Sequence, residues 1–333
     1  MTPIVNRQIL LAEKPAAKLE PGHFRMTEAA VPEPKDGEVL VRVRYISLDA
    51  ANRAWMQGAT YRSAVTADTV MAGGGLGEVV ASNAPGFVPG DLVFGDTGWQ
   101  DFAAVPARGL VKLPRIEPVT HLLSIYGVAG LTAYFGLLNV GRPKAGDTVV
   151  VSAAAGSVGS IVGQIARIKG CRAVGIAGGQ AKCDWLVSEL GFDAAVDYKA
   201  GSVFKALKAA APNGIDVYFD NVGGDILEAC LPQMNLHGRI ACCGAVSAYD
   251  GAPPASGPRG IPGLIVVKRL TMQGFIFTDF NDRRIEALAE LQAWVSEGRI
   301  KVQEDIVAGL ENTPQALIGL LAGDNRGKRM VKV

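Results

Sequence analysis

Two rhythms of apolar and polar residues divide the chain. From Asn6 to about Pro114, short apolar runs are broken by Pro and Gly. The segment EVLVRVRYISL at 38–48 alternates apolar and polar residues as a half-buried strand does. GEVVAS at 77–82 and DLVFG at 91–95 are further strand-sized runs, separated by the turn-rich NAPGFVPG. We therefore predict a mostly β domain with many turns, a small barrel or sandwich.

After about His121 strands and helices alternate. Apolar strand-sized runs predict strands at 148–152, 172–177, 194–198, 215–222, 239–244 and 270–277. Segments of helical character predict helices at 153–170, 181–191, 202–211 and 225–234. Near-continuous Val and Ile strands in this alternation are typical of a parallel sheet buried on both faces. The pattern indicates a doubly wound nucleotide-binding fold.

The C-terminal part contains two more predicted helices and a last strand. The first helix, at 282–300, carries on one side Ile285, Leu288, Leu291 and Val295. The second opens with Thr313 as N-cap and Pro314 at the first helical position. The strand KRMVKV at 328–333 has no parallel partner nearby, so we predict that it returns to the N-terminal β domain.

The predicted domains are not contiguous in sequence. Residues 1–122 together with 301–333 form a substrate or catalytic domain, and residues 123–300 form a dinucleotide-binding domain. The loop 250–263, rich in Pro and Gly, is the most irregular segment and is interpreted as a lid or contact loop.

Composition excludes several classes of protein. The apolar fraction of 49% argues against disorder, and a net charge of +1 argues against nucleic-acid binding through bulk positive charge. The five cysteines, an odd number, show neither zinc-ribbon nor redox spacing, which favours reduced thiols in the cytoplasm. The first residues lack the layout of a signal peptide, and the longest uncharged stretch, 118–141, contains Pro, His, Asn and Gly. We expect a soluble cytoplasmic protein that binds neither nucleic acid nor membrane.

The strongest motif is Ala154-x-Gly156-x-x-Gly159, between a predicted strand and a predicted helix. It is the dinucleotide glycine fingerprint with Ala in the first position. Gly156 would let the backbone approach a pyrophosphate at the helix N-terminus, and Gly159 would let the helix pack closely on the strand.

The end of the second strand distinguishes the two nicotinamide cofactors. An NAD site places Asp or Glu about twenty residues beyond the fingerprint, but residues 176–182 read IAGGQAK, with no acid and one base. Small residues leave room for a 2′-phosphate, and Lys182 can pair with it. The alternative for Lys182 is a solvated lysine at the start of a helix. The pattern favours NADP.

Ligands for a metal are scattered. The histidines are His23, His121 and His237, and no Cys precedes Cys171, so the β domain cannot assemble a Cys/His/Cys zinc site. Metal-free hydride transfer, in which the cofactor carries the chemistry, fits this inventory. Cys242 and Cys243 are interpreted as packing residues, and Trp55 and Trp99 as core or cleft wall.

Several longer stretches carry a resemblance to a known family. They are SLDAANRAWM (47–56), GWQDFAAV (98–105), GLTAYFGLLNVGRPKAGDTVVVSAAAGSVGSIVGQIARIKGC (130–171), ELGFDAAVDYK (189–199), GIDVYFDNVGGDILEACLPQMN (214–235), GRIACCGAVSAY (238–249) and GDNRGKRMVKV (323–333). With them, the chain resembles the medium-chain dehydrogenase/reductase superfamily, and within it the zinc-independent branch of leukotriene hydroxydehydrogenases, prostaglandin reductases, curcumin reductase and plant alkenal reductases. Gly73–Gly75 stand where the zinc enzymes have Gly-His-Glu. Asp49–Arg53 read DAANR where many relatives read DPYMR.

The resemblance implies a GroES-like β domain, a Rossmann domain and a site for NADPH. It implies a pyrophosphate site at Gly156, Ser157, Val158 and Gly159, and a 2′-phosphate site at Lys182 and Tyr198 with Asn221 close by. It implies a nicotinamide segment formed by Cys243, Gly244, Ala245, Val246, Ser247, Ala248 and Tyr249. It implies carboxamide contacts from Phe275, Ile276 and Phe277, closure over the cofactor by Asn325, and Tyr61 facing the substrate. It also implies a homodimer built on the Rossmann sheet edge.

The predicted reaction is reduction of an α,β-unsaturated ketone or aldehyde, by hydride transfer to the β-carbon through an enolate. Tyr249, Tyr61 or a cofactor ribose hydroxyl would donate to the enolate oxygen. Tyr249 could instead pack on the cofactor without a proton role, and Tyr61 could be a surface-loop residue. A quinone reductase is the nearest alternative function, and a non-catalytic NADPH-binding sensor is an alternative of another class.

Overall fold

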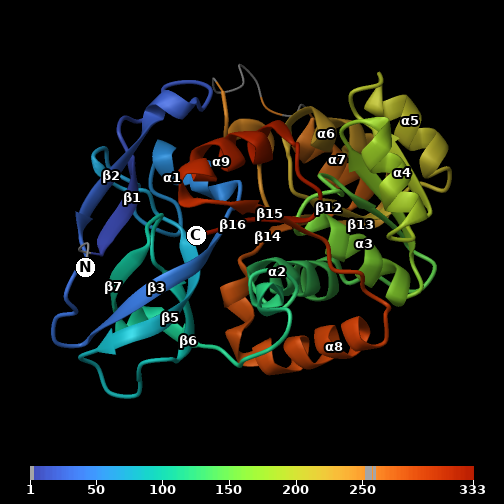
Figure 1. Cartoon of the computed structure of the whole chain (residues 1–333). Coiled ribbons are helices and arrows are strands. Elements are labelled where there is room, and N and C mark those ends of the chain that lie inside the picture. Colours follow the sequence, from blue (N-terminus) through green and yellow to red (C-terminus); the bar gives the residue numbers. More distant parts are fainter. Residues whose placement is uncertain (1–3, 252–256, 258–259) are drawn as a thin grey trace.

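The computed structural model describes residues 4–251, 257 and 260–333, and two halves of different architecture lie side by side in it (Figure 1). The N-terminal strands, blue to cyan, form a β-rich half, and the green to orange segments form an α/β half. The red C-terminal segment returns between them. The predicted α/β fold class is confirmed, whereas the domain limits at 122/123 and 300/301 stay a prediction.

The β-rich half contains two sheets, ordered β2-β1-β4 and β15-β16-β3-β5-β6-β8, with β7 pairing along β3. Their strands are β1 (Val5–Leu11), β2 (Phe24–Ala30), β3 (Glu38–Ser47), β4 (Thr69–Val70), β5 (Gly74–Ser82), β6 (Leu92–Asp96), β7 (Phe102–Pro106), β8 (Leu110–Lys112), β15 (Glu304–Ala308) and β16 (Lys328–Lys332). Along β3, Val41 and Val43 are buried while Arg42 and Arg44 are exposed, which confirms the alternation seen in the sequence.

The C-terminal strand joins the N-terminal sheet. β16 pairs antiparallel with β3, placing Met330 opposite Ser47, and pairs parallel with β15. The predicted return of the tail to the N-terminal β domain is therefore confirmed.

The α/β half is built on a parallel sheet with the order β11-β10-β9-β12-β13-β14. Its strands are β9 (Thr148–Val151), β10 (Arg172–Ala177), β11 (Ala194–Asp197), β12 (Ile215–Asp220), β13 (Met234–Cys242) and β14 (Thr271–Gly274). Counted from β9, this is the 3-2-1-4-5-6 order of the Rossmann fold, which binds dinucleotides where the order reverses, between β9 and β12.

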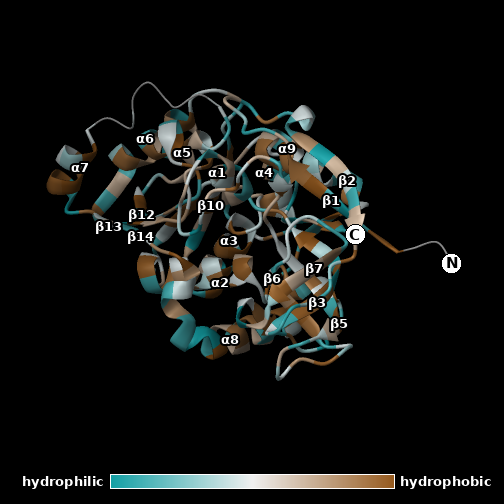
Figure 2. Cartoon of the chain, turned by 90° about the vertical axis from the view of Figure 1, so that its left-hand side faces the viewer, coloured by the Kyte–Doolittle hydropathy of each residue, from teal (hydrophilic) through white to brown (hydrophobic). Residues whose placement is uncertain are grey.

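Helices cover both faces of this sheet. The helices are α1 (Ala51–Gln57) in the β-rich half, then α2 (Val128–Phe135), α3 (Gly159–Ile168), α4 (Gln180–Ser188), α5 (Val203–Ala210), α6 (Gly224–Cys230), α7 (Ile261–Lys268), α8 (Arg284–Ser296) and α9 (Thr313–Ala322). Val149 and Val151 pack with α2, α3 and α8, whereas Val150 between them packs with α5 and α6 on the other face. The central strands β9, β10 and β12 are buried on both faces, as their apolar sequences predicted, whereas the edge strand β14 is exposed along its length. Figure 2 shows these strands brown in the interior and teal patches on the outer helices.

Several predicted boundaries shift: the helix predicted at 153–170 begins at Gly159, the strand predicted at 270–277 ends at Gly274, and α7 begins inside the predicted loop 250–263. Three further details are wrong. The helix predicted at 225–234 ends at Cys230 and continues as a 3₁₀ turn, because Pro232 has no N–H for an α-helical hydrogen bond. The predicted face of α8 includes Ile285, which is 84% exposed, whereas Leu288, Leu291 and Val295 of that face do pack on the core, together with Ala287 and Trp294.

The third detail is the start of α9. Thr313 is its first residue rather than its N-cap, and the Thr313 hydroxyl donates to Leu310 O at 2.6 Å. Residues 252–256 and 258–259 of the predicted lid or contact loop lie outside the described residues.

Candidate active site

A cleft of about 2320 Å³ lies between the two halves. Its walls include the loop before α1, the β9–α3 turn, the segment after β13 and the turn before β16. Every residue predicted as catalytic or cofactor-binding lines it: Tyr61, Gly156, Ser157, Val158, Gly159, Lys182, Tyr198, Asn221, Cys243, Gly244, Ala245, Val246, Ser247, Ala248, Tyr249, Phe275, Ile276, Phe277 and Asn325. The fold thus brings them together, while the role of each stays a prediction.

The β9–α3 turn lies at the carboxyl end of the sheet and opens α3. A Cβ on Gly156 would stand 3.2 Å from Ala153 O, and one on Gly159 only 2.4 Å from the same oxygen. The buried Ser157 hydroxyl has no hydrogen-bond partner within the described residues. A tight turn, free N–H groups at a helix N-terminus and an unpaired hydroxyl suit a pyrophosphate, so these residues fit the predicted dinucleotide.

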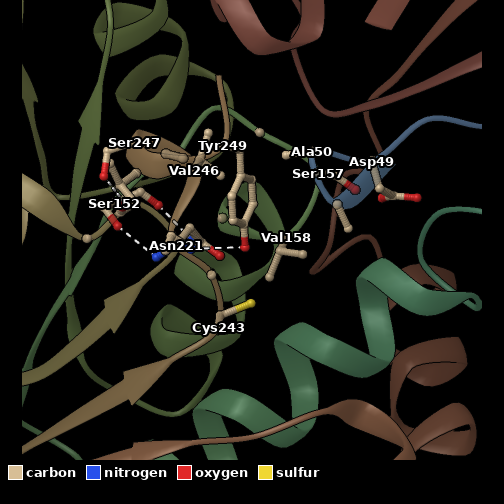
Figure 3. Close-up of a pocket in the computed structure, with 18 of the residues that line it drawn as sticks. Asp49, Ala50, Ser152, Ser157, Val158, Asn221, Cys243, Val246, Ser247 and Tyr249 are labelled. Atoms are coloured by element: carbon tan, nitrogen blue, oxygen red, sulfur yellow. Dashed lines mark hydrogen bonds between the residues drawn. The ribbon is translucent and has the colours of Figure 1, made fainter. Parts of the chain in front are cut away.

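The turn after β12 is organised by a residue that the sequence analysis did not select. Asp220 is buried, and its Oδ1 accepts hydrogen bonds from the Tyr218 hydroxyl at 2.8 Å and from the amides of Val222 and Gly223 at 3.0 and 2.8 Å. Asn221 Nδ2 donates to Ser152 O at 2.7 Å, which ties this turn to β9 (Figure 3). The sequence signal for such a turn was the segment DNVGG at 220–224, in which an Asp and an Asn precede two glycines.

Lys182 is more than a solvated lysine at a helix start. Its ammonium donates to the carbonyls of Gly323 and of Asn325, the latter at 2.7 Å, so it connects α4 to the turn before β16. Partial burial lowers the pKa of Lys182, and Asp324 nearby opposes that shift. Tyr198 lies beside the small Gly178, whose Cβ would stand 2.9 Å from the Tyr198 hydroxyl. A basic group and a phenol beside small residues match the predicted 2′-phosphate site.

The segment after β13 crosses the cleft near the loop that precedes α1. Figure 3 shows the Tyr249 ring between Asn221 and Cys243 on one side and the loop with Asp49 and Ala50 on the other. The Tyr249 hydroxyl accepts a hydrogen bond from Ala245 N at 3.2 Å. A phenol that accepts from the backbone keeps its own hydrogen available for another acceptor.

Burial keeps the cleft cysteine protonated. Removal from water raises the pKa of Cys243 to about 12, with the Asp220 carboxylate adding to the shift. A thiol with such a pKa carries no thiolate near neutral pH, so Cys243 is a wall residue rather than a nucleophile.

The substrate side of the cleft is aromatic. Trp55, Phe94, Val111 and Val128 line it, and Tyr61, 63% exposed, meets Trp55 edge-on with ring centroids 6.3 Å apart. The Arg62 guanidinium lies 4.5 Å from the centroid of the Trp55 ring and donates to Asp96 at 2.7 Å. This wall suits a flat conjugated molecule.

Gly73 and Gly75, which the sequence analysis aligned with a motif of the zinc enzymes, leave no room for a side chain. A Cβ on Gly73 would meet Trp99 Nε1 at 2.6 Å, and one on Gly75 would meet Thr97 Oγ1 at 2.0 Å. In the described parts of the chain, no three His, Cys, Asp or Glu side chains gather as metal ligands. None of the described helices is long and apolar enough to cross a membrane.

The fold and this cleft define a two-domain dehydrogenase of the dinucleotide-binding type. Residues 7–113 match the family model for the N-terminal domain of oxidoreductase, and residues 157–294 match the model for zinc-binding dehydrogenase. With the relatives below, the chain belongs to the zinc-independent branch of the medium-chain dehydrogenase/reductase family.

Relatives match almost the whole chain. It is 47% identical to the putative NADP-dependent oxidoreductase YfmJ of Bacillus subtilis, covering 98% of each protein. It is 43% identical to the NADPH-dependent curcumin reductase of Escherichia coli, covering 98% of this chain and 97% of that protein. The crystal structure of CurA from Vibrio vulnificus in complex with NADPH superposes with a TM-score of 0.93 at 42% identity, covering 98% of this chain and 99% of the other. The protein is an NADP-dependent oxidoreductase, and the sensor alternative is set aside.

Proposed function

We propose that the protein reduces the C=C bond of α,β-unsaturated ketones and aldehydes with NADPH. The observation that carries this proposal is the Tyr249 hydroxyl, whose oxygen accepts from Ala245 N and whose own hydrogen can be donated into a cleft that Trp55 and Phe94 also line. The name of the curcumin reductase relative supports a reductase of conjugated small molecules.

Bound NADPH would supply the hydride for the β-carbon of the enone. Trp55, Tyr61 and Val128 would hold the flat substrate and exclude water from the reacting atoms. Tyr249, with Tyr61 as the second candidate, would donate a hydrogen bond to the oxygen that becomes an enolate. A phenol is a weak acid near neutral pH, so this hydrogen bond orients and stabilises the oxygen, while the proton for the α-carbon comes from water or through a tyrosine.

Removal of the Tyr249 hydroxyl tests this assignment. We expect Tyr249→Phe to lower kcat on an enone by roughly 10- to 100-fold, because a positioned donor is lost in the transition state. Steady-state kinetics at saturating NADPH measures the change. Tyr126→Phe, which removes a phenol that does not line the cleft, serves as the matched control. Unchanged turnover in folded Tyr249→Phe would remove Tyr249 from the mechanism.

The reaction class is tested by NADPH oxidation with enones, quinones and saturated aldehydes, repeated with NADH. We expect NADPH-selective turnover of enones with the saturated ketone or aldehyde as product. Faster turnover of quinones to quinols would instead establish the quinone reductase.

We further propose that the protein forms a homodimer through the β14 edge of the parallel sheet. β14 pairs only with β13 among the described strands, and next to it α7 exposes Val266 and Val267, at 72% and 65% of their surface. Figure 2 shows α7 as a brown helix at the margin of the molecule. Light scattering should give twice the chain mass, and Val267→Glu should shift the protein toward the monomer.

A further inference from the structure

The segment that carries Tyr249 is held by two side chains from the opposite half of the molecule. Arg53 and Gln57 both lie on α1, while Tyr249 and Asp250 follow the last turn after β13. Arg53 Nε donates to Asp250 Oδ1 at 3.1 Å, and Gln57 Nε2 donates to Tyr249 O at 3.0 Å. The last residue of the predicted nicotinamide segment and the residue after it are thus bonded to one face of one helix.

The Arg53–Asp250 pair joins a buried guanidinium to a half-buried carboxylate and ties Asp250 to the β-rich half. Only 1% of the Arg53 side chain is exposed, and its Nη2 also donates to Ala17 O at 2.6 Å. Asp250 Oδ1 accepts a second hydrogen bond from Leu19 N at 2.7 Å. The pair therefore fixes Asp250 to two separate segments of the N-terminal part of the chain.

Stability alone gives a poor reason for this pair. Burying a guanidinium costs roughly several kcal/mol, and the attraction within the ion pair only offsets that cost. An apolar pair of similar size would therefore stabilise the fold about as well. Arg53 Nη1 is moreover buried with no hydrogen-bond partner among the described residues. What the pair supplies is direction, since Arg53 Nε donates to Asp250 while Nη2 of the same planar guanidinium donates to Ala17 O, which holds the group in one orientation.

The nicotinamide segment needs such support. Between β13 and Asp250 its regular structure is one 3₁₀ turn, Val246–Ala248, and Gly251 follows with a φ of +143°. Gln57 and Arg53 do not line the cleft, so neither side chain is placed to touch the substrate or the cofactor. An effect of either residue on turnover would have to pass through the segment they hold.

We propose that Arg53 and Gln57 are positioning residues, forming an α1 clamp that holds the Tyr249–Asp250 segment and thereby aligns the Tyr249 hydroxyl over the cleft. The kinetic part of this inference rests on the proposed role of Tyr249, whereas the holding of the segment does not. Because α1 directly follows the substrate-side loop Asp49–Ala50, the clamp also links that loop to the nicotinamide end of the site.

The experiment uses Gln57, because its side chain is exposed and its variants are expected to fold. Gln57→Met removes the donor at similar length, and Gln57→Lys retains a donor. Gln303→Ala, which removes an exposed glutamine bonded to Glu304 O away from the cleft, is the matched control. Arg53→Met is the stronger second variant. Each is studied with NADPH bound, by steady-state kinetics and by hydrogen exchange of peptide 244–250 against peptide 148–152.

We expect Gln57→Met to speed exchange in 244–250 roughly tenfold and to lower kcat roughly fivefold, the effect of one lost hydrogen bond, with KM for NADPH within about twofold. Gln57→Lys restores both, and Gln303→Ala changes neither. In a Tyr249→Phe background Gln57→Met causes no further loss of kcat, because the group it aligns is gone.

Two results would overturn the inference: unchanged exchange in 244–250 for both Gln57→Met and Arg53→Met, or kinetic losses that multiply in the double variant. Wild-type turnover by Tyr249→Phe would instead refute the proposed role of Tyr249. In that case the exchange data on the same samples still decide whether the clamp holds the segment.

Discussion

Lys182 shows how one side chain serves two parts of the molecule. In the sequence, Lys182 stands out as the one basic residue of a segment of small residues. In the structure, its ammonium also donates to two carbonyls, Gly323 O and Asn325 O. An ammonium has three donor hydrogens, so two bonds to the turn before β16 leave one for a phosphate. Lys182 would therefore bind the 2′-phosphate and also hold the turn before β16 in place.

We expect Lys182→Ala to raise KM for NADPH roughly 10- to 100-fold, the effect of losing a charge-assisted hydrogen bond to phosphate. KM for NADH, which lacks the phosphate, should rise much less, by the loosening of the turn alone. Initial-rate kinetics with both cofactors measures this ratio. Lys208→Ala, at an exposed position on α5, is the control. Equal changes for the two cofactors would contradict the 2′-phosphate assignment.

At the scale of elements, the β9–α3 unit carries the predicted pyrophosphate site. The apolar strand, the glycine turn and the helix were all predicted, and the structure confirms the order strand, turn, helix. The close approach of α3 to the turn depends on Gly159, whose missing side chain lets the helix start against Ala153 O. The predicted helix at 225–234 was too long because Pro232 was not weighed as a stop.

Gly159→Ala should displace the start of α3, because its Cβ would stand 2.4 Å from Ala153 O and 2.8 Å from Ala154 Cα. We expect about 1–3 kcal/mol of lost stability and at least roughly tenfold weaker NADPH binding. Thermal unfolding and a fluorescence titration with NADPH measure the two effects. Gly22→Ala is the matched control, since a Cβ there meets nothing within 4 Å. Wild-type affinity in Gly159→Ala would show that the close approach is not needed.

At the scale of the whole molecule, the returning C-terminal strand completes the β-rich half and one wall of the cleft. Lys328 on β16 is 1% exposed and donates to Leu48 O at 2.9 Å and to Asp49 Oδ1 at 2.5 Å. Asp49 lines the cleft and its side chain is 36% exposed. A contact between residues 279 positions apart in the chain thus fixes the position of the substrate-side loop.

The two partners of this pair should not be equivalent. Asp49→Asn leaves a buried ammonium without its counter-charge, which costs about 3–5 kcal/mol, whereas Lys328→Met leaves a carboxylate that water reaches. We therefore expect the Tm of Asp49→Asn to fall by roughly 5 °C or more, and that of Lys328→Met to fall less. Differential scanning calorimetry of both variants checks the order. The reverse order would mean that the Asp49 carboxylate depends on its partner more than the Lys328 ammonium does.

The sequence by itself determined the class of fold and the cofactor. Apolar periodicity, the fingerprint 154–159 and the absence of an acid at 176–182 are local signals, because each depends on residues close together in the chain. Gly156, Gly159 and Lys182, which these local signals selected, line the cleft. Ile285 was assigned to the wrong face because a helix side is chosen by what packs against it, which a single segment does not contain.

Only the tertiary structure decided which side chains hold the site in shape. Asp220 gathers donors from its own turn, while Arg53 meets Asp250 and Lys328 meets Asp49 across 197 and 279 residues of chain. Ion pairs and side-chain bonds to backbone carbonyls have no sequence period, since any Arg or Lys suits any carboxylate that folding brings within reach. Their partners are fixed by the path of the chain, and that path places the Tyr249 segment beside α1.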